Sequence, residues 1–232
     1  LNQGEPIVIP VFFGLKGLSL SEQERDFFKS VHPAGFILFA RNIETPEQVR
    51  ELTDELRDLS NDDDLPVLID QEGGRVARLR PPYWTAHPPS EIYGRLYAQD
   101  KEAAKRAVFL TGQIIAAELL ELGINVDCLP VLDIPASNAD PVIGDRAYAL
   151  NAEDVSVLGR WAAQSLMDNG VVPVIKHIPG HGRALVDSHL SLPIVDAPID
   201  DLRRSDFSPF KALNDMPMAM TAHVVYEAID KA

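Results

Sequence analysis

The sequence has little cysteine and no long apolar segment. Its 232 residues include a single cysteine, Cys128, so an internal disulfide is excluded. Cys128 lies in the strand-like run 124–132, where we expect a buried, unreactive thiol. No apolar run approaches the ~20 residues that span a bilayer, and the first one, 7–13, lacks the basic flank and cleavage pattern of a signal peptide. We therefore expect a cytoplasmic protein without a membrane partner.

Positive charge is also scarce. The chain has 21 lysines and arginines against 35 aspartates and glutamates, which gives a formal net charge of −14 at pH 7. This excess of negative charge argues against nucleic acid or an anionic membrane surface as a partner. It is compatible with a small neutral or anionic ligand, because a local cationic pocket can form in an acidic protein. The hydrophobic fraction of 46% is sufficient for a sizeable core.

Strand-like apolar runs alternate with helix patterns along the chain. This alternation predicts parallel strands joined by right-handed crossovers, and runs that are apolar on both faces are typical of buried parallel strands. No flexible linker and no sequence repeat divides the chain, so we expect residues 1–232 to form one domain. The predicted strands are 7–13, 35–39, 66–69, 124–132, 171–175 and 217–225.

Capping residues mark the predicted helices. Ser21 with Glu24, and Thr45 with Gln48, have the spacing of capping boxes. A weaker helix pattern at 200–213 is interrupted by a proline. Longer helices are predicted to begin at Asp100 and Asn151 and to end at glycine caps, Gly123 and Gly170.

Polar side chains follow or end four of the predicted strands. Asp70 follows the third, Asp133 the fourth and the pair Lys176-His177 the fifth, while His223 lies late in the sixth. Active groups of parallel α/β folds gather at the carboxyl ends of the strands. Four strands that deliver polar groups to one rim favour a closed barrel over an open sheet.

The segment 176–193 concentrates titratable side chains in a glycine-containing loop. It holds three of the six histidines, and Asp187 and His189 are one residue apart, so both side chains can face the same way. A carboxylate that accepts a proton from one imidazole nitrogen leaves the other nitrogen free for proton transfer. A surface Asp-x-His in a loop, without function, is the alternative for this pair alone.

Four motifs together resemble those of a known family. Lys-His-Ile-Pro-Gly-His-Gly from Lys176, followed by Asp-Ser-His from Asp187, resembles the signature of family 3 glycoside hydrolases of the bacterial β-N-acetylglucosaminidase type, with Ile178 where phenylalanine is usual. Asp-Gln-Glu-Gly-Gly-Arg-Val-Ala-Arg at 70–78 resembles a second family motif. Gly-Asp-Arg at 144–146 and Thr-Ala-His at 221–223 resemble two others, all in the family's order.

The resemblance implies a (β/α)8 barrel, with about six of its eight βα units in these 232 residues. It also implies hydrolysis, with retention, of non-reducing β-linked N-acetylglucosamine (GlcNAc). The family's substrates are peptidoglycan fragments, in which GlcNAc is linked to 1,6-anhydro-N-acetylmuramic acid with or without peptide. No metal or organic cofactor is implied. The implied acid/base is His189, oriented by Asp187, and the implied sugar-binding residues are Asp70, Arg78, Arg146, Lys176 and His177.

The carboxylate nucleophile is the part of the site that we do not find in the chain. Retaining glycosidases ordinarily pair their acid with a carboxylate about 5 Å away. The resemblance places this aspartate beyond residue 232, so we expect the functional protein to include two further βα units. Within the chain, Asp133 is the alternative, although Pro130 and Pro135 beside it predict a structural turn. Glu72 is expected to brace its loop.

Three other functions are compatible with parts of the sequence. A metal-dependent hydrolase could use His177, His181, His189 and Asp187, but a proline and a glycine between His177 and His181 predict a loop rather than a metal-binding helix face, and the first strand has no His-x-His. A carbohydrate-binding protein would keep the pocket without turnover. A phosphorylase would exploit a neutral histidine base, which does not repel phosphate. The sequence makes no prediction of the oligomeric state.

Overall fold

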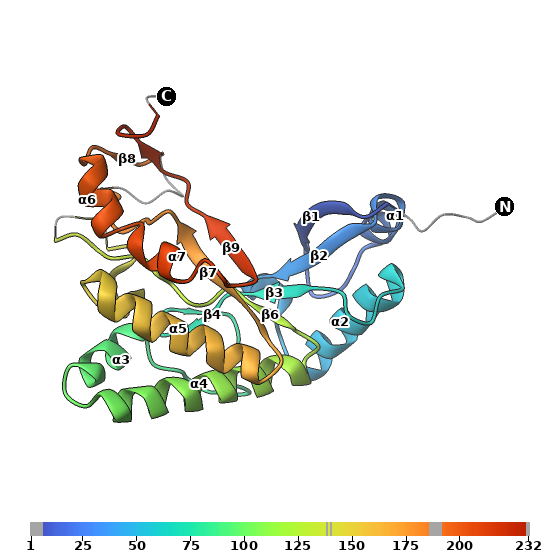
Figure 1. Ribbon diagram of the computed structural model, residues 1–232. Coiled ribbons are helices and arrows are strands. Elements are labelled where there is room, and N and C mark those ends of the chain that lie inside the picture. The colour runs from blue at the N-terminus through green and yellow to red at the C-terminus, as the bar shows by residue number, and fades with distance from the viewer. Residues whose placement is uncertain (1–6, 138, 140, 186–191, 231–232) are drawn as a thin grey trace.

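The protein is built around one curled sheet of six parallel strands (Figure 1). The computed structural model describes residues 7–137, 139, 141–185 and 192–230. Neighbouring strands follow the chain order β1-β2-β3-β6-β7-β9, as in a (β/α)8 barrel, and β1 and β9 form the two edges. The six predicted strands are therefore confirmed, as is the partial (β/α)8 fold. They are β1 (Ile9–Gly14), β2 (Pro33–Leu38), β3 (Val67–Ile69), β6 (Val126–Asp127), β7 (Val172–Ile178) and β9 (Met218–Thr221).

Helices cover the outer, convex face of this sheet, where α4 and α5 lie side by side and α2 follows near the C-terminal end of α4 (Figure 1). Among the described residues, no helix is both long and apolar enough to cross a membrane. The helices are α1 (Glu22–Val31), α2 (Pro46–Ser60), α3 (Ser90–Tyr97), α4 (Lys101–Glu121), α5 (Ala152–Asp168), α6 (Ile199–Arg204) and α7 (Ser208–Ala212).

Most of the predicted helix boundaries are confirmed. Ser21 and Glu24 form the predicted capping box at the start of α1. Thr45 caps α2 as predicted. The prediction of a full capping box is wrong here, because the Gln48 side chain accepts the backbone N–H of Glu44 rather than that of Thr45. The same amide donates to two loop carbonyls, which draw it away from the cap. The proline at 209 does interrupt the pattern, and the chain there forms the two short helices α6 and α7.

The structure contains elements that the sequence did not predict. A short hairpin of β4 (Gln71–Gly73) and β5 (Val76–Ala77) follows β3, and helix α3 follows the proline-rich loop. β8 (Ile194–Val195) pairs with β10 (Val225–Tyr226) outside the main sheet. Lys176 and His177 lie inside β7 rather than beyond it, and β9 ends at Thr221, before His223.

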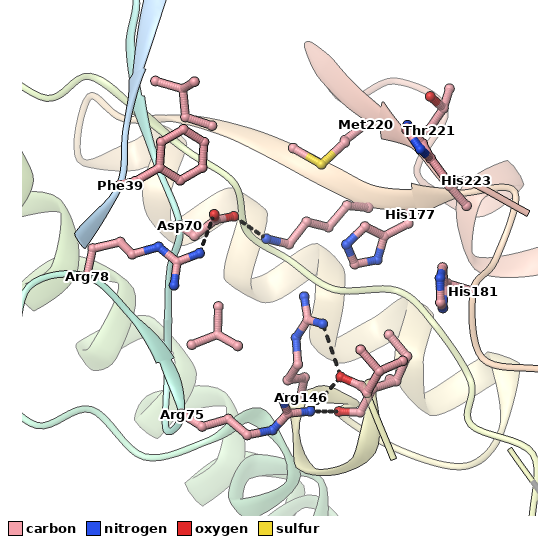
Figure 2. Close-up of a pocket in the computed structure, with 16 residues that line it drawn as sticks. Phe39, Asp70, Arg75, Arg78, Arg146, His177, His181, Met220, Thr221 and His223 are labelled. Carbon is pink, nitrogen blue, oxygen red and sulfur yellow. Dashed lines mark hydrogen bonds and ion pairs between the residues drawn. The ribbon is translucent and has the colours of Figure 1, made fainter. Parts of the chain in front are cut away.

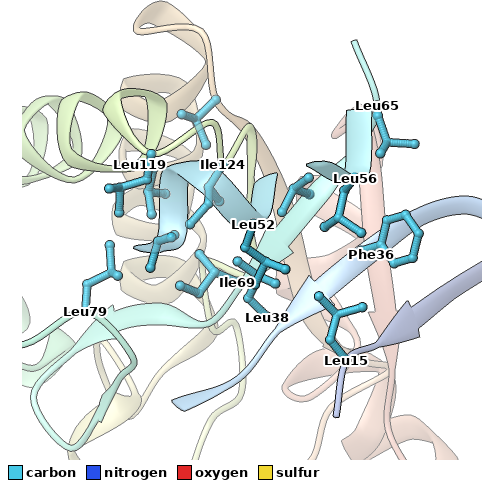
Figure 3. Close-up of a cluster of buried hydrophobic side chains, with 14 of the residues drawn as sticks. Leu15, Phe36, Leu38, Leu52, Leu56, Leu65, Ile69, Leu79, Leu119 and Ile124 are labelled. Carbon is cyan, nitrogen blue, oxygen red and sulfur yellow. The ribbon is translucent and has the colours of Figure 1, made fainter. Parts of the chain in front are cut away.

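Alternate residues of the strands supply two apolar layers. Phe36, Leu38 and Ile69 point to the helices and join a buried cluster with residues of α2 and α4 (Figure 3). Leu68 and Cys128 face the inside of the curled sheet. Full burial of each large aliphatic side chain contributes roughly 1.5–3 kcal/mol. The thiol of Cys128 is completely buried, and burial raises its pKa to about 12, which agrees with the predicted unreactive cysteine.

Close backbone contact fixes α3 against the loop that precedes α5. Gly94 in α3 packs so closely on the carbonyl oxygen of Tyr148 that a Cβ atom at position 94 would overlap it. Tyr93 and Tyr148 belong to the same buried cluster, which joins α3, α4 and α5. Only glycine therefore allows this helix to reach its place against α4 and α5.

We predict that Gly94→Ala destabilises the protein. The steric overlap with backbone should cost about 1–3 kcal/mol in the free energy of unfolding, which exceeds the ~1 kcal/mol that alanine contributes as a better helix former. Urea denaturation of the protein that contains this chain measures the change. Gly17→Ala is the matched control, because no atom lies within 4 Å of its added Cβ. Equal stability of the two variants would contradict the argument.

Candidate active site

A cavity of about 630 Å³ opens at the carboxyl ends of the strands (Figure 2). All five of the residues that we expected to bind sugar line it. Parallel strands bring these ends to one rim, which explains how residues from three distant segments meet. The five are Asp70, Arg78, Arg146, Lys176 and His177, and they are joined by Phe39, Arg75, His181, Met220, Thr221 and His223 among others.

Lys176 lies at the centre of the charged groups. Its side chain is 1% exposed, and its Nζ lies 2.8 Å from Asp70 Oδ1 and 2.6 Å from Glu72 Oε1. Burial by itself would lower the pKa of this ammonium group, but the charges of Glu72 and Asp70 outweigh burial and raise the pKa above its ordinary value. Lys176 is therefore a fixed cation at neutral pH.

The two carboxylates reach Lys176 because they lie on either side of Gln71. Successive side chains of an extended segment point to opposite faces, so Asp70 and Glu72 share one face. Burial opposes their ionisation, yet Lys176 and the arginines outweigh it, so the pKa of Asp70 falls to about 2 and that of Glu72 is also lowered. Both groups are consequently ionised at neutral pH.

Two arginines complete this charged cluster. Arg146 binds Glu72 through two bonds of 2.8 Å each, Nε to Oε2 and one terminal nitrogen to Oε1. Arg78 donates to Asp70 Oδ2, also at 2.8 Å. Three cations thus face two anions, which leaves one excess positive charge in a protein of net charge −14. We expected Glu72 to brace its own loop, and the structure shows that it holds Lys176 and Arg146 from other segments.

His177 is held by Asp133. The Nδ1 atom of His177 lies 2.6 Å from Asp133 Oδ2, and the other carboxylate oxygen accepts the backbone N–H groups of His177 and His181, at 3.3 and 2.7 Å. Asp133 is completely buried, but its contacts with His177 outweigh burial and lower its pKa. This arrangement leaves Nε2 as the ring nitrogen of His177 that Asp133 does not engage.

The same contacts show whether Asp133 can serve as the nucleophile. It has no exposed surface, and both of its oxygens are engaged by the segment around His177. A nucleophile must reach the reacting carbon, which a fully buried and fully bonded carboxylate does not. Asp133 is therefore a structural brace, as Pro130 and Pro135 indicated.

The predicted sugar-binding set omitted several residues that line the cavity, among them Arg75 and His181, and His181 was considered only as a metal ligand. Arg75 binds the carbonyl oxygen of Pro141 and the carboxylate of Asp145, each at 3.1 Å, and so holds the loop that presents Arg146. His181 is buried, and its ring stands edge-on to that of His177 with 5.8 Å between the ring centroids. Burial lowers the pKa of His181, which favours a neutral ring. The position of Arg75 within the 70–78 motif was the signal that could have indicated it.

The predicted acid/base pair, Asp187 and His189, lies outside the described residues. The stem before it is fixed: Arg183 Nε donates to Asp206 at 2.8 Å, and the Tyr226 hydroxyl donates to the carbonyl of Gly180. The roles of Asp187 and His189 stay predictions.

The residues proposed for a metal site do not converge in the part of the chain that the structure describes. No group of three histidine, cysteine, aspartate or glutamate side chains there has the geometry to hold a metal ion. Two of the four residues in that hypothesis, Asp187 and His189, are outside this part. A third, His177, uses Nδ1 to bind Asp133.

Comparison with known proteins places these motifs in one family. Residues 8–232 match the glycosyl hydrolase family 3 N terminal domain. The beta-hexosaminidase of Alkalilimnicola ehrlichii is 39% identical over 223 residues, which cover 95% of this chain and 63% of that protein. The beta-hexosaminidase of Methylococcus capsulatus is 40% identical over 222 residues, 94% of this chain and 64% of that protein.

A solved structure shows the same fold. The crystal structure of NagZ from Neisseria gonorrhoeae in complex with N-trifluoroacetyl-D-glucosamine superposes with a TM-score of 0.89 at 35% identity, and the match covers 95% of this chain and 65% of that one. The chain therefore spans less than two thirds of the length of these relatives. Because the match runs through every motif described above, this chain belongs to the N-terminal domain family of glycosyl hydrolase family 3.

Proposed function

We propose that this chain carries the sugar-binding part of a β-N-acetylglucosaminidase. The enzyme removes non-reducing β-linked GlcNAc from peptidoglycan fragments in the cytoplasm, with GlcNAc linked to 1,6-anhydro-N-acetylmuramic acid as the substrate, with or without peptide. One observation carries the proposal: five residues from three separate motifs meet in one cavity, namely Asp70, Arg78, Arg146, Lys176 and His177. The relatives named beta-hexosaminidase, and the relative bound to an N-acylated glucosamine, support the choice of sugar.

The charged cluster suits a pyranose because each hydroxyl group both donates and accepts a hydrogen bond. The Asp70 carboxylate accepts from hydroxyl groups, while the arginine and lysine nitrogens donate to them. Hydrogen bonds to charged groups are the stronger ones. Their partners already hold these side chains in place, so sugar binding orders few side chains and costs little entropy.

The proposed chemistry proceeds in two steps. His189, oriented by Asp187, gives a proton to the leaving glycosidic oxygen while an aspartate beyond residue 232 attacks the anomeric carbon and forms a glycosyl-enzyme. In the second step His189 takes a proton from water, the water oxygen attacks the same carbon, and the aspartate leaves. Two displacements give overall retention. An unperturbed imidazole pKa of ~6.5 suits both proton transfers at neutral pH.

We predict that the full-length protein hydrolyses chromogenic β-GlcNAc glycosides and that Asp70→Asn lowers kcat/KM by about 10- to 100-fold. This is the effect of weakening one charged hydrogen-bond acceptor in a buried site. The variant also loses the negative charge that Lys176 and Arg78 bind. Asp215→Asn is the matched control, because Asp215 is 58% exposed and pairs with Arg160 outside the cavity.

The same assay separates the proposal from the other functions. GlcNAc binding without product would indicate a carbohydrate-binding protein. Product formation that requires inorganic phosphate, and yields GlcNAc 1-phosphate, would indicate a phosphorylase. Equal activity of the Asp70→Asn and Asp215→Asn variants would refute the sugar-binding role of Asp70.

A second prediction concerns His189. In the full-length protein, His189→Gln should reduce kcat/KM strongly for aryl glycosides with poor leaving groups and far less for activated ones, because a good leaving group needs little protonation. General acid catalysis contributes typically 10²–10⁴-fold, which sets about the largest loss expected. A series of substituted phenyl β-GlcNAc glycosides measures the dependence. A loss that is uniform across the series would argue against the acid/base role.

A further inference from the structure

We propose that Gln71 is a positioning residue that fixes Arg78 against Asp70 in the cavity. The inference deepens the proposed function, because Arg78 is one of the residues to which we assign the sugar. The geometry that supports it is independent of that assignment. Gln71 does not line the cavity, and the sequence analysis gave it no role.

Gln71 points away from the cavity. It stands between Asp70 and Glu72, whose side chains both contact Lys176, so the alternation of an extended segment directs Gln71 to the opposite face. There it is completely buried. A buried amide must satisfy its polar atoms within the protein, since an unmet donor or acceptor costs about 1–3 kcal/mol.

The Gln71 side chain meets this demand by binding the backbone around Arg78. Its Oε1 atom accepts the N–H groups of Arg78 at 2.9 Å and of Leu79 at 3.1 Å, and its Nε2 atom donates to the Leu79 carbonyl at 3.0 Å. One side chain therefore makes three hydrogen bonds to two consecutive residues. We call this set of three bonds the Gln71 clasp.

Arg78 depends on this backbone anchor. Its guanidinium group donates to Asp70 at 2.8 Å, but its Nε atom is buried with no hydrogen-bond partner among the described residues. The hairpin that leads to it is short, because β4 and β5 pair only through Gln71 with Ala77 and Gly73 with Val76. The Gln71 clasp extends this pairing beyond Ala77 to Arg78, whose side chain enters the cavity, and to Leu79.

A second contact ties the clasp to the main sheet. The backbone N–H of Gln71 donates to Asp127 Oδ1 at 3.0 Å. Asp127 is fully buried in β6, and burial raises the pKa of its carboxyl well above the usual value, only partly offset by the Gln71 N–H. The position of Arg78 is thus set from β6 through Gln71, by groups that never face the cavity.

The test uses the full-length protein with Gln71→Met, which removes all three bonds at similar volume, and Gln71→Asn, which keeps the amide but is too short to reach residue 79. Asn is the second variant in case Met at a polar site prevents folding. Arg78→Ala and the double variant Gln71→Met with Arg78→Ala complete a double-mutant cycle. Gln48→Met is the control, because Gln48 also binds two backbone carbonyls but lies on α2, away from the cavity.

Two measurements are made on each variant. The first is the pKa of the Asp70 carboxyl by carbon-13 NMR, which Lys176 and Arg78 hold at about 2 against the effect of burial. The second is the Kd of GlcNAc by NMR titration. We expect Gln71→Met and Gln71→Asn to raise the Asp70 pKa toward its ordinary value. We also expect both variants to raise the Kd of GlcNAc about tenfold, which is the effect of losing one charged hydrogen bond. In the double variant, Gln71→Met should add nothing to Arg78→Ala.

Unchanged Asp70 pKa and GlcNAc affinity in both Gln71 variants would overturn the inference. So would effects that simply add to those of Arg78→Ala, since Gln71 would then not act through Arg78. If the parent protein does not bind GlcNAc, the proposed function fails, and the Asp70 pKa still decides the role of Gln71.

Discussion

The site depends on the burial of one ammonium group. Lys176 is 1% exposed, and removing such a charge from water costs several kcal/mol unless anions surround it. Asp70 and Glu72 supply those anions at 2.8 and 2.6 Å. Because Lys176 and Asp70 are 106 positions apart in the sequence, this contact also joins β7 to the segment that follows β3. Stability and the architecture of the site therefore rest on the same ion pairs.

The other polar groups of the cavity follow from this arrangement. Glu72 has a second function, since it fixes Arg146 by two bonds while it neutralises Lys176. Asp70 likewise receives Arg78 on its free oxygen. His177 adjoins Lys176 in β7 but uses a separate carboxylate, Asp133. Two neighbouring residues of one strand thus enter two separate charge systems, one that holds cations and one that orients an imidazole.

The fold determines where these groups meet. Parallel strands deliver the residues at their carboxyl ends to one rim, while the apolar clusters on both faces of the sheet hold the strands in order. Membership of the glycosyl hydrolase family 3 N-terminal domain family agrees with this architecture. An overall acidic chain forms a charged cluster with one excess cation around Lys176, because its positive side chains gather where buried carboxylates hold them.

Much of this organisation could be predicted from the sequence because it depends on local patterns. Apolar runs and capping residues gave the six strands and most helix boundaries, and polar residues after those runs indicated the rim of the cavity. Five of the seven predicted site residues meet in the described cavity, while Asp187 and His189 lie outside the described residues. The residue types were informative because charged groups at the ends of buried strands need partners there.

The tertiary structure, by contrast, decided which side chains of the site contact one another. Nothing local in the sequence shows that Glu72 lies between Lys176 and Arg146, that Asp133 holds His177, or that Gln71 grips the backbone at Arg78. The contacts of Glu72 with Arg146 and of Asp133 with His177 join residues 74 and 44 positions apart and exist only once the strands have assembled, whereas those of Gln71 form within the β4–β5 hairpin. The sequence by itself determined which strands form and which chemical groups they carry, because the spacing of apolar residues and the residue types are local properties. The tertiary structure decided which groups meet, because a buried charge is stable only beside the partner that folding brings to it.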